Sequence, residues 1–235
     1  MALFPNPDNE HSFCNDCQVK HFSMKALTED EIQLINKSKF QASFQKGDIL
    51  IHEGTPASHI IYLKSGLVKE FIKGEHEKEQ ILQILKKYSF LGLSSFFGDK
   101  IHRYSYAALE DITICYYDLS VFLQLIKQNG NFSYDILVSV ARDNLNNFNR
   151  FMKQSQKKTY GRIADVILYF STIIYESKEF EIPFTRQELS EMIGISREST
   201  ARILTKFHEE GIILLNDRRI VITNLPLLQQ ISKNG

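Results

Sequence analysis

The stretch "FTRQELSEMIGISRESTARILTKFHEEG", residues 184–211, contains the start signals of two short helices. Thr185 and Glu188 have the spacing of a capping box, in which each side chain bonds the backbone amide of the other residue, so the first helix is expected to begin there. Ser196 is a favoured N-cap for the second helix. Gly194 supplies the tight turn between them. Two short helices joined in this way form a helix-turn-helix.

The second helix places apolar and charged residues on opposite sides. Its apolar side follows the helical spacing i, i+3, i+4 and i+7 at Thr200, Ile203, Leu204 and Phe207. Glu198 and Arg202 lie roughly opposite that side, and Arg197 lies in the first turn. In helix-turn-helix proteins these first residues contact base edges in the DNA major groove. The alternative is that Glu198 and Arg202, four residues apart, form only an exposed ion pair.

Downstream, "IILLNDRRIVITN" (residues 212–224) has two alternating β segments about Asn216 and Asp217, which predicts a hairpin and therefore a winged helix. Arginines at or near the hairpin turn can reach phosphates, although a solvated turn explains them equally well. Arginine suits guanine and glutamate suits the cytosine amino group. The candidate DNA-binding residues are Arg197, Glu198, Ser199, Thr200, Arg202, Lys206, Thr185, Arg186, Arg218 and Arg219.

The composition of the whole chain is that of an ordinary globular protein. Its 235 residues predict one or two domains, and 43% hydrophobic residues are enough for a sizeable core. Lys plus Arg and Asp plus Glu number 28 each, so a globally cationic coat is excluded while a local basic surface is not. The start, "MALFPNPDNEH", is not a signal peptide, and no run is long and apolar enough to span a membrane. We expect a cytoplasmic protein with no membrane partner.

Motifs of common enzyme classes are absent from the sequence. We find no Walker loop, no GxGxxG after a strand, no HExxH and no GxSxG. We therefore expect no enzymatic activity.

Between Phe44 and Asp118, short strand-like segments alternate with Gly-centred turns, which predicts a β barrel or roll. A capping box at Thr28 and Glu31 predicts a short helix just before it.

A long helix is predicted over residues 132–155, with a narrow apolar seam and a polar opposite side. Such a seam is typical of a two-stranded contact between subunits, and the alternative is that it packs on its own β domain. The candidate dimer-interface residues are Leu137, Ala141, Leu145, Phe148 and Met152.

Two motifs together resemble the Crp/Fnr family of bacterial transcription regulators, and the resemblance covers nearly the whole chain. They are "KGDILIHEGTPASHIIYLKSGLVK" (46–69) and "RQELSEMIGISRESTARIL" (186–204). The resemblance implies an α+β fold with an N-terminal β-roll of the cyclic-nucleotide-binding, jelly-roll type, a long dimerisation helix and a C-terminal winged helix-turn-helix. The expected domains are an arm at 1–26 with Cys14 and Cys17, an effector-sensing β-roll at 27–130, a dimerisation helix at 131–156 and a DNA-binding domain at 157–235.

The function implied is that of a homodimeric, sequence-specific DNA-binding transcription regulator. Its β-roll would sense a small ligand or redox signal and position two recognition helices in successive major grooves of near-palindromic double-stranded DNA. RNA polymerase is a further candidate partner. The alternative function is a cyclic-nucleotide-type ligand-binding module acting on a protein partner, which would not need base-reading residues on an exposed first turn.

The resemblance also points to an effector loop, "FLGLSSFFGDKIHRYSYAAL", residues 90–109. Family members that bind cyclic AMP use a Gly-Glu pair and, some ten residues later, an Arg-Ser pair. Here Leu93 follows Gly92, and Tyr104 separates Arg103 from Ser105, so cyclic AMP is not expected. The alternative for Arg103 is a surface residue on a loop. The candidate pocket residues for another small-molecule effector are Gly92, Leu93, Ser94, Ser95, Arg103, Tyr104 and Ser105.

The cysteines suggest a second type of sensor. Cys14, Cys17 and Cys115 resemble three of the four cysteines of iron–sulfur family members, and Ser23 stands where the remaining one is expected. A [4Fe–4S] cluster is normally held by four thiolates, so three cysteines would need a fourth ligand, for which His21 is a candidate. His11, Cys14, Cys17 and His21 are also a candidate zinc set, and haem held by a histidine stays open. The alternative is that Cys14 and Cys17 lie in a loose arm and Cys115 is a small buried hydrophobe.

Overall fold

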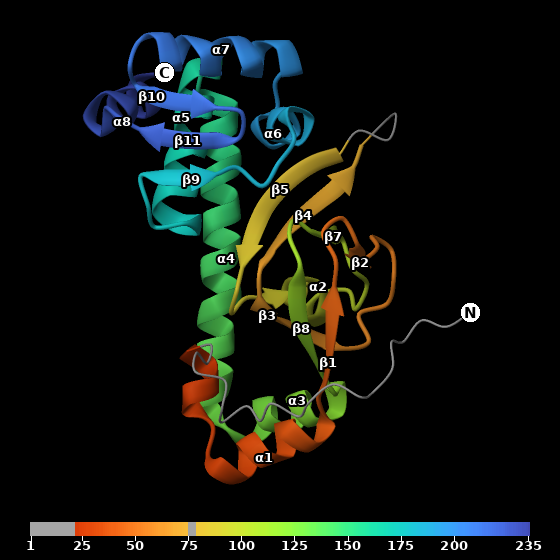
Figure 1. The fold of residues 1–235 in the computed structure, drawn as a ribbon. Helices are drawn as coiled ribbons and strands as arrows, with labels where there is room; N and C mark the ends of the chain where they lie inside the picture. Colours follow the sequence, from red (N-terminus) through yellow and green to blue (C-terminus); the bar gives the residue numbers. More distant parts are fainter. Residues whose placement is uncertain (1–21, 75–78) are drawn as a thin grey trace. The chain divides into compact units, whose positions relative to one another are not determined.

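The computed structural model describes residues 22–74 and 79–235 and has an α+β fold (Figure 1). The chain forms two compact units, one made mainly of residues before 146 and the other mainly of residues 146–235. Within the described ranges, no helix combines the length and apolar character needed to cross a bilayer.

A short helical region opens the first unit. It consists of a 3-10 turn, η1 (Phe22–Ala26), and α1 (Glu29–Ser38). The predicted capping box is confirmed, because the Glu31 carboxylate accepts from the Thr28 amide at 2.8 Å and the Thr28 hydroxyl accepts from the Glu31 amide at 3.4 Å. The helix buries Ile32 and Ile35 in an apolar core that it shares with α3 (Leu119–Gln128).

The predicted β-roll is confirmed as two four-stranded sheets whose paired strands run antiparallel. One sheet has the order β1 (Phe40–Phe44), β8 (Ile112–Tyr117), β3 (Ile60–Ser65), β6 (Phe90–Leu91). The other has the order β2 (Ile49–Ile51), β7 (Ser105–Ala108), β4 (Leu67–Lys73), β5 (Glu79–Lys86). A short helix, α2 (Leu93–Phe97), follows β6. Leu63, Val68 and Ile114 are completely buried in one core cluster, to which strands of both sheets contribute.

The long helix α4 (Gly130–Gln156) extends slightly beyond the predicted 132–155. Asn129 precedes it, and its side-chain oxygen accepts from the Phe132 amide at 2.9 Å. The basic segment KQSQKK (153–158) is mostly helical, since only Lys157 and Lys158 separate α4 from the next helix.

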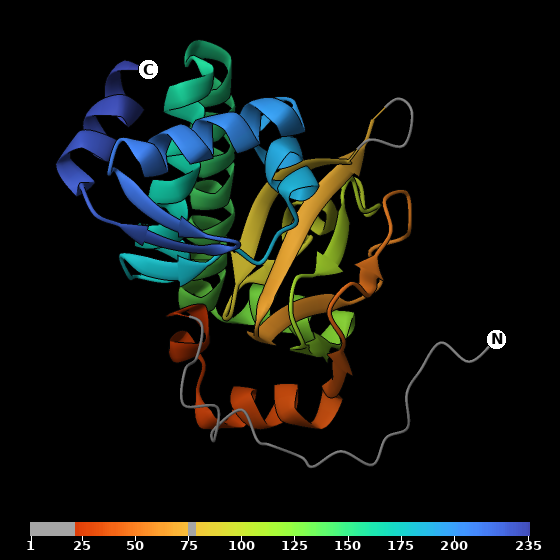
Figure 2. The ribbon, with the colours of Figure 1, turned by 45° about the horizontal axis from the view of Figure 1, so that its top comes forward.

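The second unit is a winged helix-turn-helix (Figures 1 and 2). Its elements in chain order are α5 (Thr159–Tyr169), the π-helical turn η3 (Phe170–Ile174), β9 (Glu179–Glu181), α6 (Arg186–Ile193), α7 (Arg197–Glu209), β10 (Ile213–Asn216), β11 (Arg219–Ile222) and α8 (Leu225–Asn234). The three strands form an antiparallel sheet of order β10-β11-β9.

The position of the hairpin turn corrects the sequence prediction. Asn216 pairs with Arg219, so the turn residues are Asp217 and Arg218, one position later than predicted. Asp217 has φ of 50°, a left-handed conformation that aspartate tolerates better than most side chains do. The turn therefore forms where the chain reaches a residue suited to that backbone.

Two turn glycines of the β-roll allow a matched test of packing. Both have left-handed φ, +87° at Gly66 and +94° at Gly47. A Cβ on Gly66 would lie 2.6 Å from Ile112 Cγ2 and 2.9 Å from the Asp111 carbonyl oxygen, whereas nothing lies within 4 Å of a Cβ on Gly47.

We expect Gly47→Ala to lower the free energy of unfolding by about 1–2 kcal/mol through left-handed strain alone. Gly66→Ala adds overpacking and should cost roughly 1–3 kcal/mol more. Urea denaturation followed by circular dichroism measures the difference. Equal midpoints for the two variants would contradict the packing at the Gly66 turn.

Candidate nucleic-acid interface

The two helices of the motif begin at the residues that the sequence predicted. The Thr185 amide donates to Glu188 at 2.9 Å and the Thr185 hydroxyl accepts from the Glu188 amide at 3.2 Å, which completes the capping box of α6. Gly194 ends α6 with a φ of 74°. The Ser196 hydroxyl then accepts from the Ser199 amide at 3.1 Å and caps α7.

The inner side of α7 is completely covered by the rest of the unit. Thr200 and Phe207 have no exposed surface, and Ile203 and Leu204 are 1% exposed. Arg197, Glu198 and Arg202 are exposed. Burial of one side of α7 therefore presents the other side, with its charged residues, to solvent.

Thr200 does not have the role predicted for it in DNA contact. Its side chain is fully buried, and its hydroxyl donates to the Ser196 carbonyl oxygen at 3.1 Å. A hydroxyl satisfied in this way behaves as part of the core, which explains why threonine fits the apolar spacing of α7.

Glu198 and Arg202 do not form the ion pair proposed as an alternative. Among the residues that the structure describes, no ion pair joins them. Hydrogen bonds from its own backbone amide and from Ser196 lower the pKa of Glu198, so it is ionised at the N-terminus of α7. An ionised carboxylate in this position is an acceptor, as a contact to a cytosine amino group requires.

A hollow of about 330 Å³ lies beside the first turn of α7. Three guanidinium groups line it, those of Arg186, Arg197 and Arg218, and so does Asp217. The Arg186 guanidinium donates to the Asp217 carbonyl oxygen, which ties α6 to the tip of the hairpin. Burial lowers the pKa of Arg186, and Asp217 opposes this effect. The remaining donor capacity around the hollow suits a phosphate group.

Two other predicted contact residues have neighbours that the sequence did not reveal. Arg219 forms an ion pair with Glu179 on β9. The Lys206 ammonium lies 5.2 Å from the ring centroid of Tyr160 and 3.7 Å from a Glu210 carboxylate oxygen. Glu179 lies 40 residues before Arg219 and Tyr160 lies 46 residues before Lys206, so no local sequence signal links them to these cations.

The candidate effector residues of the first unit do not converge on one site. Arg103 is a surface residue, which corrects its predicted pocket role, because its Nε donates to Asp99 at 2.6 Å and its side chain is 61% exposed. Leu93 is buried in the apolar core and Ser94 is exposed. Ser95 and Ser105 are buried and accept from the amides of Arg103 and Glu53, at 3.1 and 3.0 Å. Gly92 starts α2 with a φ of 68°, and Tyr104 is half-buried against the roll core.

His102 is a buried polar residue that the sequence analysis did not single out. It is 5% exposed, and its Nδ1 has no hydrogen-bond partner among the described residues. Burial lowers the pKa of His102, so its ring is neutral at pH 7. A Cβ on Gly92 would lie 2.7 Å from Nδ1, so glycine is required there by the ring as well as by its backbone conformation.

The structure tests the predicted metal ligands at one position. His11, Cys14, Cys17 and His21 lie outside the described residues. Cys115 is on β8, 5% exposed, in the apolar core. Within the described ranges no three His, Cys, Asp or Glu side chains are grouped to hold a metal. The described residues thus supply one of the four thiolates that an iron–sulfur cluster normally needs.

Comparison with known proteins matches both units to family models. Residues 41–129 match the cyclic nucleotide-binding domain, and residues 161–231 match the Crp-like helix-turn-helix domain. The chain belongs to the Crp/Fnr family. Members of the Crp/Fnr family are transcription regulators, so this chain is a DNA-binding transcription regulator.

Individual Crp/Fnr relatives cover most of the chain. The cAMP-activated global transcriptional regulator CRP of Pasteurella multocida is 29% identical over 177 residues, which are 74% of this chain and 85% of that protein. The fumarate nitrate reduction regulatory protein of Klebsiella oxytoca is 23% identical over 225 residues, 93% and 90% of the two chains. The structure of FixK2 from Bradyrhizobium japonicum shares the fold, with a TM-score of 0.76 at 18% identity over 83% of this chain and 97% of that one.

Base reading by α7 predicts different outcomes for two cations of the same helix. Arg202→Ala should cost roughly 1–3 kcal/mol per half-site and relax the preference at one base position. Lys206→Ala should weaken binding to all sequences alike and reduce the salt slope by about one unit for each phosphate that is no longer neutralised. Selection and sequencing of randomised duplexes, with titrations at several salt concentrations, measures both. Unchanged base preference in Arg202→Ala would show that this arginine does not read DNA.

Proposed function

We propose that this regulator acts as a homodimer that binds a near-palindromic DNA site through two copies of α7. The observation that carries the proposal is a row of apolar side chains on α4 that is left exposed by the residues that the structure describes. Leu137 and Leu145 are each 64% exposed and Phe148 is 63% exposed.

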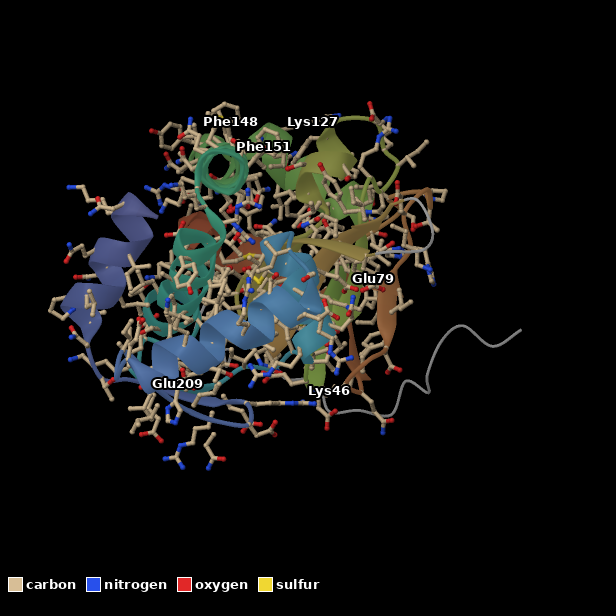
Figure 3. The ribbon with its side chains drawn as sticks, turned by 90° about the horizontal axis from the view of Figure 1, so that it is seen from above. Lys46, Glu79, Lys127, Phe148, Phe151 and Glu209 are labelled. Atoms are coloured by element: carbon tan, nitrogen blue, oxygen red, sulfur yellow. The ribbon has the colours of Figure 1, made fainter. Side chains whose placement is uncertain are left out.

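Two further aromatic residues extend this row. Tyr134 is 66% exposed and Phe151 is 65% exposed, while the predicted members Ala141 and Met152 are exposed and half-buried. Figure 3 looks down on the molecule and labels Phe148 and Phe151 beside α4. We call these seven residues the α4 seam. The exposure of the seam supports a contact between subunits over the alternative from the sequence, which is packing on its own β domain.

A second copy of the chain is the occupant that fits the α4 seam. A continuous apolar row on one helix face is typical of coiled-coil-like contacts, and a two-fold axis would place the same face on both partners. Dimerisation would double the protein surface that contacts DNA. The half-sites would then lie about one helical turn, roughly 10–10.5 bp, apart.

At each half-site we assign guanine contacts to Arg197 and Arg202 and a cytosine contact to Glu198. Their exposure on the first two turns of α7 supports this assignment. Phosphate contacts are assigned to Arg186 and Arg218, which line the hollow beside the first turn of α7. As a regulator without enzymatic activity, the dimer would act in the cytoplasm and meet RNA polymerase at the promoter.

We further propose that the β-roll responds to a signal other than cyclic AMP. A buried Leu93 has no acceptor for a ribose hydroxyl, and Arg103, paired with Asp99 at the surface, does not face the interior as a partner for a cyclic phosphate. Without these two groups the roll lacks the interactions on which affinity for that ligand depends.

The dimer proposal predicts the effect of a charge in the α4 seam. Leu145→Glu should convert the dimer into a monomer, because an unpaired carboxylate would be buried at the interface. Asn146→Glu adds the same charge at an exposed neighbouring position that points away from the seam and should leave the dimer intact. Light scattering measures the mass of each variant. A dimeric Leu145→Glu protein would contradict the assignment of the seam.

The nature of the signal can be tested on protein purified without oxygen. If Cys14, Cys17 and Cys115 hold an iron–sulfur cluster, this protein has a broad visible absorbance that oxygen bleaches. Cys115→Ala should then abolish the absorbance. Colourless protein free of iron would leave the buried Cys115 as a core residue, and metal analysis of the same sample separates zinc from an apo protein.

A further inference from the structure

The connection between α4 and the DNA-binding domain is only two residues long. Helix α4 ends at Gln156 and α5 begins at Thr159. The second of the two residues, Lys158, is the N-cap of α5 in an extended conformation, and its side chain makes no capping hydrogen bond. A link this short transmits the direction of one helix to the other, provided that it is held rigid.

Lys157, the first linking residue, is bonded through both its side chain and its backbone carbonyl. Its ammonium lies 2.8 and 2.7 Å from the two carboxylate oxygens of Asp165 on α5, and the two side chains are 17% and 20% exposed. The Ser232 hydroxyl of α8 also donates to Asp165. The Arg162 Nε donates to the Lys157 carbonyl oxygen at 2.8 Å. A partly buried pair supported by further hydrogen bonds has a defined geometry and is costly to break.

From Asp165, direct packing continues to the recognition helix. Tyr160 on α5 contacts the fully buried Phe207 of α7, with ring centroids 5.8 Å apart. At the next residue, α5 packs closely on the end of α8, since a Cβ on Gly161 would lie 2.8 Å from the backbone of Gly235. Close packing transmits a displacement without absorbing it. The position of α7 relative to the end of α4 therefore depends on the junction at Lys157.

We propose that Lys157 and Asp165 are a positioning pair that sets the spacing between half-sites which the dimer accepts. This inference rests on the proposed dimer and its two-part operator. Each base pair added between half-sites moves the second one by about 3.4 Å and turns it by roughly 35°. A rigid junction in each subunit presents the two copies of α7 at one separation and one angle. A junction without the ion pair allows the two copies of α7 several separations and angles.

The experiment compares operators that have the same half-sites but differ in spacer length by one or two base pairs. Two variants remove the ion pair with little change in volume, Lys157→Met and Asp165→Asn. The matched control is Lys158→Met, which removes the same charge from the adjacent, exposed position. Both lysine variants lose one positive charge, so the non-specific attraction to DNA changes equally.

Wild type and Lys158→Met should prefer one spacer over its neighbours by at least about tenfold. In Lys157→Met and Asp165→Asn this preference should fall by about tenfold, the size expected for one charge-assisted hydrogen bond, roughly 1.4 kcal/mol. The base preference within each half-site should not change, because the residues that read it are untouched. Lys157→Arg, which keeps the charge and the donors, should restore the preference.

Light scattering and thermal unfolding are used to check that each variant is a folded dimer. Asp165→Asn is nearly isosteric with the wild-type side chain, so this variant tests the junction even if Lys157→Met does not fold. Wild-type spacing preference in both pair-breaking variants would overturn the inference and leave the proposed function standing. Equal binding of wild type to all spacers would overturn it as well. Failure of wild type to bind any two-part operator would instead overturn the proposed function on which the inference rests.

Discussion

Burial of one side of α7 is the constraint on which the DNA-binding surface depends. Ile203, Leu204 and Phe207 are covered almost completely, and this fixes the rotation of the helix about its axis. The side with Arg197, Glu198 and Arg202 then has to face outward, because a helix cannot rotate without moving apolar area into water. Base-reading residues gain precision from being on a helix held by its opposite side. The burial of Thr200 shows how complete that support is.

Helix α4 also has one buried side, but the side that it exposes is apolar. Its inner residues Phe132 and Ile136 are buried, while the α4 seam stays in contact with solvent in the single chain. Apolar rows of this size on a solvated helix are typical of contact surfaces. One helix therefore supports its own domain on one side and, in the dimer that we propose, would provide the subunit contact on another. The Lys157–Asp165 pair follows directly at its end, where two residues link α4 to the DNA-binding domain.

The β-roll keeps the frame of a cyclic-nucleotide-binding domain with changed interior chemistry. Its Gly-centred turns, the helix α2 and two-sheet core are present. Leu93 belongs to the core, Arg103 is at the surface, and His102 is buried with an unpartnered Nδ1 among the described residues. The strands depend on apolar alternation and turn glycines, whereas ligand selectivity depends on a few polar groups that can be exchanged without loss of the roll.

Local signals in the sequence by themselves determined the architecture. Capping boxes at Thr28 and Thr185, the turn at Gly194 and the spacing of apolar residues located the helices, and Gly-centred turns located the roll, because each depends on residues within about four positions. Only the tertiary structure decided which side chains meet. In the folded protein Thr200 is buried and Arg103 bonds Asp99. Arg186 bonds the hairpin tip, and Lys157 pairs with Asp165. These contacts depend on how the elements pack and on which side chains the packing leaves exposed to solvent. The spacing of residues along the chain specifies neither the packing nor the exposure.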